Sequence, residues 1–171
     1  MITISLCMIV KNEEEVLARC LDSVKDIVDE IIIVDTGSTD RTKKIAAAYT
    51  EHVYDFPWIE DFSAARNYSF SKGTKEYCMW LDADDVINDE NKNKFLDLKR
   101  NMNPQVDIVM MKYHTNFDEA GNPTFSYYRE RLIKNQRISM AKPDSRSHNS
   151  LWKCYLFGNR GRTPKIKARR S

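Results

Sequence analysis

The chain has 171 residues, of which 42% are hydrophobic and 30% are charged, and its formal net charge is +2. This length fits one domain with a sizeable core, and the composition is that of an ordinary globular protein. No apolar run reaches the roughly 18 residues that a membrane-spanning helix needs, so we expect no transmembrane segment. The first six residues lack the basic region of a signal peptide, and we expect a strand there instead.

The charge is unevenly distributed along the chain. Residues 137–171 contain ten Lys and Arg and one acid, whereas the preceding residues carry a net charge of −7. Such a contrast indicates two segments with different partners or origins. The cysteines have no CxxC or metal-ligand spacing, so we expect reduced thiols in a cytoplasmic protein. They are Cys7, Cys20, Cys78 and Cys154.

The first hundred residues alternate between predicted strands and predicted helices. Apolar and β-branched runs predict strands at residues 2–10, 31–34, 52–55 and 76–81. Helical spacing predicts helices at residues 13–25, 41–49, 62–71 and 91–101. We expect Asn12 to cap the first helix and Gly73 to stop the third. The alternation favours right-handed βαβ units and a Rossmann-like α/β fold with a mainly parallel sheet flanked by helices.

The pattern changes after the first hundred residues. Two strands are predicted at residues 106–115 and 124–133, and the short turn between them favours an antiparallel addition near residues 106–134. No regular period is sustained after Lys134. We therefore expect a domain at residues 1–135 and a basic, poorly ordered tail at residues 136–171, either truncated or read in a shifted frame.

Three predicted strands end in polar residues that can bind a ligand. The segments that follow the strands are Lys11–Glu13, Asp35–Ser38 and Asp82–Asp85. Ligands of open parallel sheets bind beyond the carboxyl ends of the strands. If these strands are parallel, the three segments meet at one edge of the sheet, and we expect the binding site there.

The last of these segments places Asp82, Asp84 and Asp85 within four residues. Carboxylates this close repel one another unless a cation or a donor compensates their charge. Mg²⁺ and Mn²⁺ prefer oxygen ligands, and Mg²⁺ completes its shell with water and phosphate. A metal held here would bridge both phosphates of a nucleotide. The alternative is a solvated acidic turn that caps a helix.

Two further side chains are candidates for the same site. Asp35 ends an apolar strand, where a carboxylate can accept a hydrogen bond from a base or a ribose, and Gly37 permits close approach of the backbone to a ligand. Arg66 could pair with a phosphate or with the acidic segment. In the alternative interpretations, Asp35 and Asp40 only cap the next helix, and Arg66 is a plain surface charge.

Four segments resemble, in sequence and order, the family 2 inverting glycosyltransferases with the GT-A fold. They are SLCMIVKNEE at residues 5–14, IVDTGSTD at 33–40, FSAARN at 62–67 and WLDADD, with its DXD pattern, at 80–85. The resemblance covers about residues 1–135 and is especially close to a bacterial subgroup with KNEE openings, some of whose members carry tetratricopeptide repeats.

The resemblance implies where a nucleoside would bind. Asp35 would hold the base, usually uracil. The backbone around Met8 and Val10, together with Glu13, would line the nucleoside pocket, and Asp82 would face the nucleoside.

The resemblance also implies the donor and the cofactor. Arg66 would lie near the diphosphate, and Asp84 would bind Mn²⁺ or Mg²⁺ with help from Asp85. The donor would be a UDP-sugar, and the transfer would invert the anomeric configuration. The acceptor would be a saccharide, a lipid-linked molecule or a peptide.

The family takes its general base from an ED pair or, in this subgroup, from a residue near an HE pair. Neither pair follows Asn135, and Arg146–His148 only faintly resembles the histidine motif, so we assign no base. A catalytically silent nucleotide-sugar binding fragment is therefore an alternative. Another is a phosphoacceptor or phosphatase domain, which also has acids at strand ends. A third is peripheral contact of the basic tail with the inner face of a membrane, and we expect no nucleic-acid partner.

Overall fold

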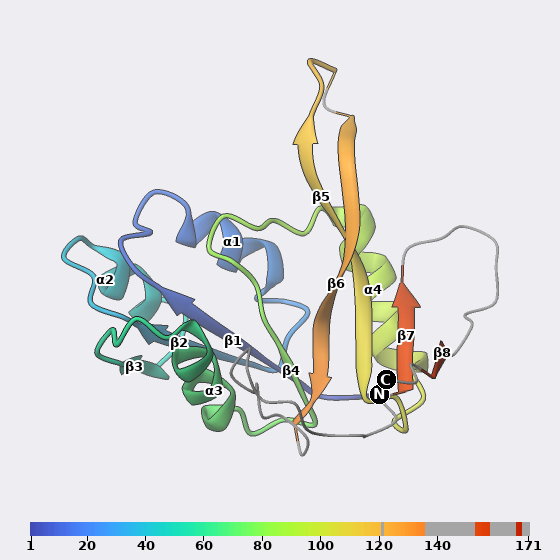
Figure 1. Cartoon of the computed structure of the whole chain (residues 1–171), viewed down its shortest axis with the longest axis horizontal. Coiled ribbons are helices and arrows are strands. Elements are labelled where there is room, and N and C mark those ends of the chain that lie inside the picture. The colour runs from blue at the N-terminus through green and yellow to red at the C-terminus, as the bar shows by residue number, and fades with distance from the viewer. Residues whose placement is uncertain (121, 136–152, 158–166, 169–171) are drawn as a thin grey trace.

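The computed structural model describes residues 1–120, 122–135, 153–157 and 167–168. Eight strands form one sheet in the order β3-β2-β1-β4-β6-β5-β7-β8 (Figure 1). The strands are β1 Ile4–Val10, β2 Glu30–Asp35, β3 Val53–Asp55, β4 Tyr77–Met79, β5 Ile108–Phe117, β6 Pro123–Lys134, β7 Lys153–Phe157 and β8 Lys167–Ala168. The helices are α1 Leu17–Val24, α2 Thr42–Ala47, α3 Phe62–Lys72 and α4 Asp89–Asn101.

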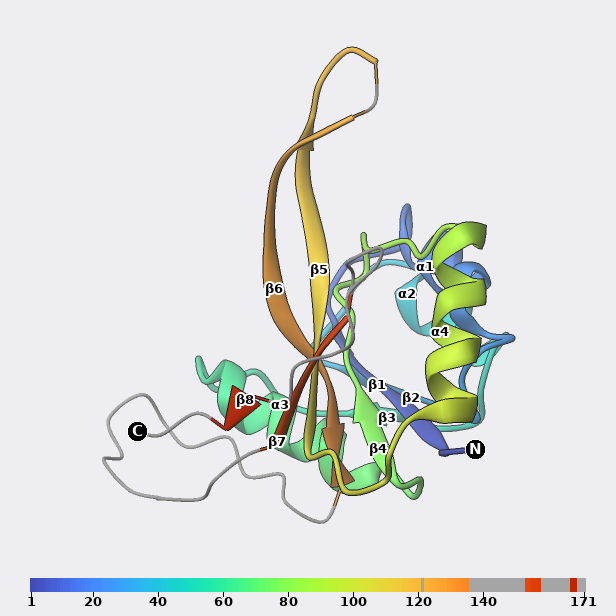
Figure 2. The ribbon, with the colours of Figure 1, turned by 90° about the vertical axis from the view of Figure 1, so that its right-hand side faces the viewer.

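In the parallel half of the sheet, β1, β2 and β4 are largely buried on both faces, whereas the edge strand β3 is not. β1 pairs in parallel with β2 and with β4, and β2 pairs in parallel with β3. Alternate residues of β1 enter two different cores: Met8 packs in one core with Phe95 of α4, and Cys7 packs in the other with Phe70 of α3. Figure 2 shows α1, α2 and α4 on one side of the sheet and α3 on the other. This arrangement explains the nearly continuous apolar runs of β1 and β2.

The predicted antiparallel addition is confirmed. β6 pairs antiparallel with both β4 and β5. β5 therefore runs in the direction of β4, and the far half of the β5–β6 hairpin projects past the carboxyl end of β4 (Figures 1 and 2). The register of the hairpin shifts between Val109 and Met110, which leaves Arg131 in a bulge. A bulge re-aims a side chain, and this one places Arg131 beside the loop that follows β4.

Two strands lie within the predicted basic tail. β7 pairs in parallel with β5, and β8 pairs antiparallel with β7. The other residues of 136–171 lie outside the described residues, and the division of the chain at residue 135 stays a prediction. Cys7, Cys20 and Cys78 are buried and free, whereas the side chain of Cys154 lies outside the described part. No helix in the described ranges is both long and apolar enough to cross a membrane.

The prediction that Asn12 caps the first helix is wrong. α1 begins only at Leu17, and the residue before it, Val16, has no side-chain capping hydrogen bond. Asn12 adopts a positive φ of 55° and connects two loops instead. Its backbone N–H donates to the Ser38 hydroxyl at 2.9 Å, and its Oδ1 accepts the Thr39 N–H at 2.8 Å. Non-local hydrogen bonds thus replace the local cap.

The core under α4 supports the edge of the sheet that carries the polar loops. Phe95 is 2% exposed. We expect Phe95→Ala to lower the free energy of unfolding by about 3–5 kcal/mol because it removes buried area and leaves a cavity. Phe62→Ala, at a position that is 67% exposed, should cost about 1 kcal/mol or less. Urea unfolding of both variants measures the difference, and equal losses would contradict this account of the core.

Candidate functional site

The loops that follow β1 and β2 are bonded to each other at the carboxyl edge of the sheet. The Thr36 N–H donates to the Val10 carbonyl at 2.9 Å, and the Thr36 hydroxyl donates to the same oxygen at 3.2 Å. The Glu13 N–H donates to the Thr42 hydroxyl at 2.7 Å. The side chains of Met8 and Val10 are buried in the core. A ligand would therefore contact the backbone around these two residues rather than the residues themselves.

The Glu13 carboxyl senses acids of both the β2 loop and the loop that follows β4. Burial raises the pKa of the Glu13 carboxyl, and repulsion from Asp84, Asp40 and Asp82 raises it further. Acids from the β2 loop and from the β4 loop thus act on one carboxyl group. The three polar segments lie together, as expected for neighbouring parallel strands.

Asp35 is buried at the end of β2, with an exposed fraction of 1%. Its Oδ1 accepts the Gly37 N–H at 2.9 Å and the Ser38 N–H at 2.8 Å. Its Oδ2 is buried without a hydrogen-bond partner among the described residues. A buried acceptor that lacks a donor is costly, so a donor group of a ligand would stabilise it. Gly37 has a φ of 107°, which brings the backbone into a conformation that few other residues adopt.

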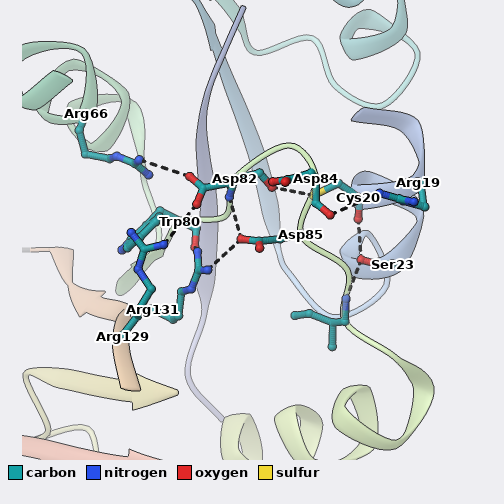
Figure 3. Close-up of polar contacts among 11 residues, drawn as sticks. Arg19, Cys20, Ser23, Arg66, Trp80, Asp82, Asp84, Asp85, Arg129 and Arg131 are labelled. Carbon is teal, nitrogen blue, oxygen red and sulfur yellow. Dashed lines mark hydrogen bonds and ion pairs between the residues drawn. The ribbon is translucent and has the colours of Figure 1, made fainter. Parts of the chain in front are cut away.

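The acids after β4 differ in their surroundings (Figure 3). The Asp85 side chain is 8% exposed and forms an ion pair at 2.9 Å with Arg131, whose side chain is 4% exposed. Asp85 Oδ2 also accepts the Asp82 N–H at 2.9 Å, while the Asp85 N–H donates to the Asp82 carbonyl at 3.1 Å. Asp84 is exposed, and its backbone carbonyl accepts a hydrogen bond from Arg19 at 3.5 Å. The segment is therefore more than a solvated acidic turn.

Three arginines surround the indole ring of Trp80, and we call Arg66, Arg129 and Arg131 the arginine cluster. Their guanidinium carbons lie 4.4, 4.5 and 4.2 Å from the ring centroid, within the range of cation–π attraction. Sequence reasoning identified Arg66 and missed the other two. Their spacing in the sequence could have identified them. Arg129 and Arg131 are two residues apart on the strand predicted at residues 124–133, so two cations were expected close together on one strand.

Two members of the arginine cluster, Arg66 and Arg129, flank the carboxylate of Asp82. Arg66 Nη2 lies 3.9 Å from Asp82 Oδ1, and Arg129 Nη1 lies 3.4 Å from Asp82 Oδ2 (Figure 3). Burial lowers the pKa of Arg66 to about 10; repulsion from Arg131 and Arg129 adds to this effect, and attraction to Asp82 opposes it. Only 12% of the Arg66 side chain is exposed, so Arg66 is not a plain surface charge.

The donor set at this edge is compatible with a divalent cation. Asp84 offers an exposed carboxylate, and the crowding of acids around Glu13 is the kind of charge that a cation relieves. Within the part of the chain that the structure describes, no group of three or more His, Cys, Asp and Glu side chains could hold a metal by itself. Mg²⁺ usually takes one or two carboxylates and adds water and substrate phosphate.

A groove of about 780 Å³ opens beside Asp84. It lies between α4 and the β5–β6 hairpin, and apolar and polar side chains both line it. The lining includes Met79, Leu81, Phe95, Lys94, Lys112 and His114.

Comparison with known proteins finds a family that matches most of this chain. Residues 5–157 match the family described as Glycosyl transferase family 2. A TPR repeat-containing protein of Synechococcus elongatus is 51% identical over 87 residues, which are 51% of this chain and 22% of that protein. The SPbeta prophage-derived glycosyltransferase SunS of Bacillus subtilis is 39% identical over 106 residues, which are 57% of this chain and 24% of that protein. The chain thus spans about a quarter of the length of these relatives.

Solved structures share the fold. Glucosyl-3-phosphoglycerate synthase from Mycobacterium tuberculosis in complex with UDP is 23% identical, with a TM-score of 0.55 over 67% of this chain and 46% of that chain. The same enzyme in complex with Mn²⁺ and UDP-glucose has a TM-score of 0.54 over 67% and 44% of the two chains, at 22% identity. TarS of S. aureus has a TM-score of 0.51 over 68% and 36%, at 19% identity. At these identities the likeness shows the fold alone, and it confirms the predicted GT-A fold.

The buried pair of Arg131 and Asp85 should be important for stability. Arg131→Gln leaves a buried carboxylate without its cation, and we expect a loss of about 3–5 kcal/mol in the free energy of unfolding. Arg100→Gln removes an exposed ion pair with Asp97, and we expect a change of about 1 kcal/mol or less. Urea unfolding measures both losses. A loss for Arg131→Gln no larger than that for Arg100→Gln would show that the pair is dispensable.

Glu13 should make stability depend on pH. Because its pKa is raised in the folded chain, the folded state holds the proton more tightly, and stability falls as the pH rises above the ordinary Glu range. Glu13→Gln cannot ionise, so in the absence of metal the variant should gain stability over the wild type between about pH 4 and pH 7. Unfolding in EDTA at both pH values measures the gain. Glu51→Gln, at an exposed position, is the control, and an equal gain in both variants would argue against the crowding of acids.

Proposed function

The chain belongs to glycosyl transferase family 2, and on this basis we propose that its carboxyl edge binds a UDP-sugar together with Mn²⁺ or Mg²⁺ and transfers the sugar, with inversion, to an acceptor. The observation that carries the proposal is a pair of carboxylates, one at the end of β2 and one in the loop that follows β4. Asp35 has a buried oxygen without a donor, and Asp84 has an exposed carboxylate on the same edge.

The nucleoside would lie over the ends of β1 and β2. The unpartnered Oδ2 of Asp35 would accept an N–H of the base, which is why a base with a ring N–H, such as uracil, suits this position. The backbone around Met8 and Val10, with Glu13, would line the pocket, and Asp82 would face the nucleoside. The neighbouring turn at Gly37 allows the backbone to approach the ligand closely.

The diphosphate and the cation would lie over the end of β4. Asp84 would bind the cation directly. Asp85 Oδ2 already contacts Arg131 and the Asp82 N–H, so Asp85 would assist through its other oxygen. A bound cation would stabilise the charge that develops on the departing diphosphate. Arg66 would add a second positive charge on the side of α3.

The structural neighbours support the choice of donor and cation. Structures of the mycobacterial synthase contain UDP, and one of them contains Mn²⁺ with UDP-glucose. That protein shares the fold of this chain. The shared fold and the carboxylates at the strand ends together favour the same class of ligand here.

Transfer needs more than donor binding. An inverting transfer requires a base that deprotonates the acceptor, and a missing base typically costs about 10²–10⁴-fold in rate. All donor-binding residues proposed here lie within residues 1–135, so donor binding is testable by itself. We propose a saccharide, a lipid-linked molecule or a peptide as acceptor, and a cytoplasmic location that includes the inner face of the membrane.

Binding of UDP should depend on the metal and on Asp84. We expect UDP to bind in the presence of Mn²⁺ and Asp84→Asn to weaken this binding by about tenfold or more, since one charged ligand contact contributes roughly 1.5–3 kcal/mol. Asp97→Asn, at an exposed position on α4, should bind as the wild type does. Calorimetric titration with and without Mn²⁺ measures these affinities. Equal, metal-independent heats for the wild type and Asp84→Asn would refute the proposed function.

A further inference from the structure

We propose that Arg129, together with Arg66, binds the distal phosphate of the nucleoside diphosphate, and that Asp82 holds the two guanidinium groups in place until this phosphate displaces it. The inference rests on the proposed function and adds to it a residue of β6 and an exchange of partners. Three features of the arginine cluster support it: the long distances from Asp82 to Arg66 and Arg129, the position of Arg129 along the edge of the sheet, and the pairing of Arg131 with another acid.

The contacts of Asp82 with these two arginines are long. The distances of 3.9 Å to Arg66 and 3.4 Å to Arg129 exceed the roughly 2.7–2.9 Å of a strong charge-assisted hydrogen bond. Nη1 of Arg66 is buried and has no hydrogen-bond partner among the described residues. One carboxylate therefore serves two cations and satisfies neither fully. A phosphate, with more oxygens and more charge, would satisfy both.

Arg131 is occupied elsewhere and cannot take this role. Its Nη2 pairs with Asp85 at 2.9 Å, and its Nη1 donates to the Trp80 carbonyl at 3.0 Å. Its side chain is 4% exposed, whereas that of Arg129 is 31% exposed. Arg129 is therefore the arginine of β6 that a ligand can reach. The face of the Trp80 ring restricts the orientation of its guanidinium group.

The order of the strands places Arg129 on the side of the distal phosphate. The sheet runs from β2 through β1 and β4 to β6, with Asp35 at the β2 end, Asp84 after β4 and Arg129 on β6. Neighbouring strands lie about 4.8 Å apart, so β2 and β6 are separated by about 14 Å. A nucleotide whose base lies at Asp35 would extend its phosphates across β4 toward β6. The phosphate farther from the base would then lie nearer Arg129.

The exchange also has a consequence for Asp82. The Asp82 carboxylate lies between Arg66 and Arg129 (Figure 3). Once a phosphate takes these cations, the carboxylate becomes available to accept hydrogen bonds from the ribose. Binding of the phosphate would thus prepare the contact of Asp82 with the nucleoside.

The test compares uridine, UMP and UDP, each with diamagnetic Mg²⁺, in titrations followed by NMR. The proteins are the wild type, Arg129→Gln, Arg129→Lys and the control Arg100→Gln. Arg129→Gln should weaken UDP binding by about tenfold to a hundredfold and leave uridine binding unchanged, because one charge-assisted contact with the distal phosphate is lost. The affinity for UMP should fall much less than the affinity for UDP. Arg129→Lys keeps the charge, so its affinity for UDP should lie between those of the wild type and Arg129→Gln. The control Arg100→Gln should bind UDP as tightly as the wild type does.

The outcomes separate this inference from the proposed function. A wild type that binds none of the three ligands would overturn both. A wild type that prefers UDP to uridine, with the same preference in Arg129→Gln, would overturn the inference and leave the proposed function standing. If both Arg129 variants lost affinity equally for all three ligands, Arg129 would only support the fold, and this result would also overturn the inference.

Discussion

Parallel pairing of β2, β1 and β4 is the constraint on which the candidate site depends. Three parallel strands bring their carboxyl ends to the same edge of the sheet, so the loops after Val10, Asp35 and Met79 come together although they are far apart in the chain. The loops then interlock through hydrogen bonds such as that of Asn12 with Thr39. Without this pairing the acids would be separate surface charges.

The charges at this edge are arranged in two different ways. The pair of Arg131 and Asp85 is short and buried, and it connects the bulge of β6 with the loop after β4. The contacts of Asp82 with Arg66 and Arg129 are longer and more exposed. Removing one partner of a buried pair lowers the free energy of unfolding strongly, whereas long, exposed contacts can be exchanged with little change in free energy. The first arrangement holds the loop in place, and the second leaves two cations available for an anionic ligand.

Local sequence patterns predicted helices and strands well where the apolar residues of the pattern are also the residues that pack in the core. β1 and β2 are apolar on both faces because helices cover both faces, and their runs were recognisable for that reason. The start of α1 was predicted wrongly because Asn12 bonds to residues 38 and 39 instead of to its own helix. The bulge at Arg131 had no local signal, since it arises from the register between β5 and β6.

The α/β class, the family resemblance and the polar residues at the strand ends were readable from the amino-acid order alone, because apolar periodicity and short motifs are local properties of a chain. The burial of Asp85 against Arg131, the exposure of Asp84 and the position of Trp80 among three arginines became known only from the folded chain. These features depend on contacts between β4 and β6, which lie some fifty residues apart in the chain. Burial and pairing at such separations follow from strand order and register, which no local pattern encodes.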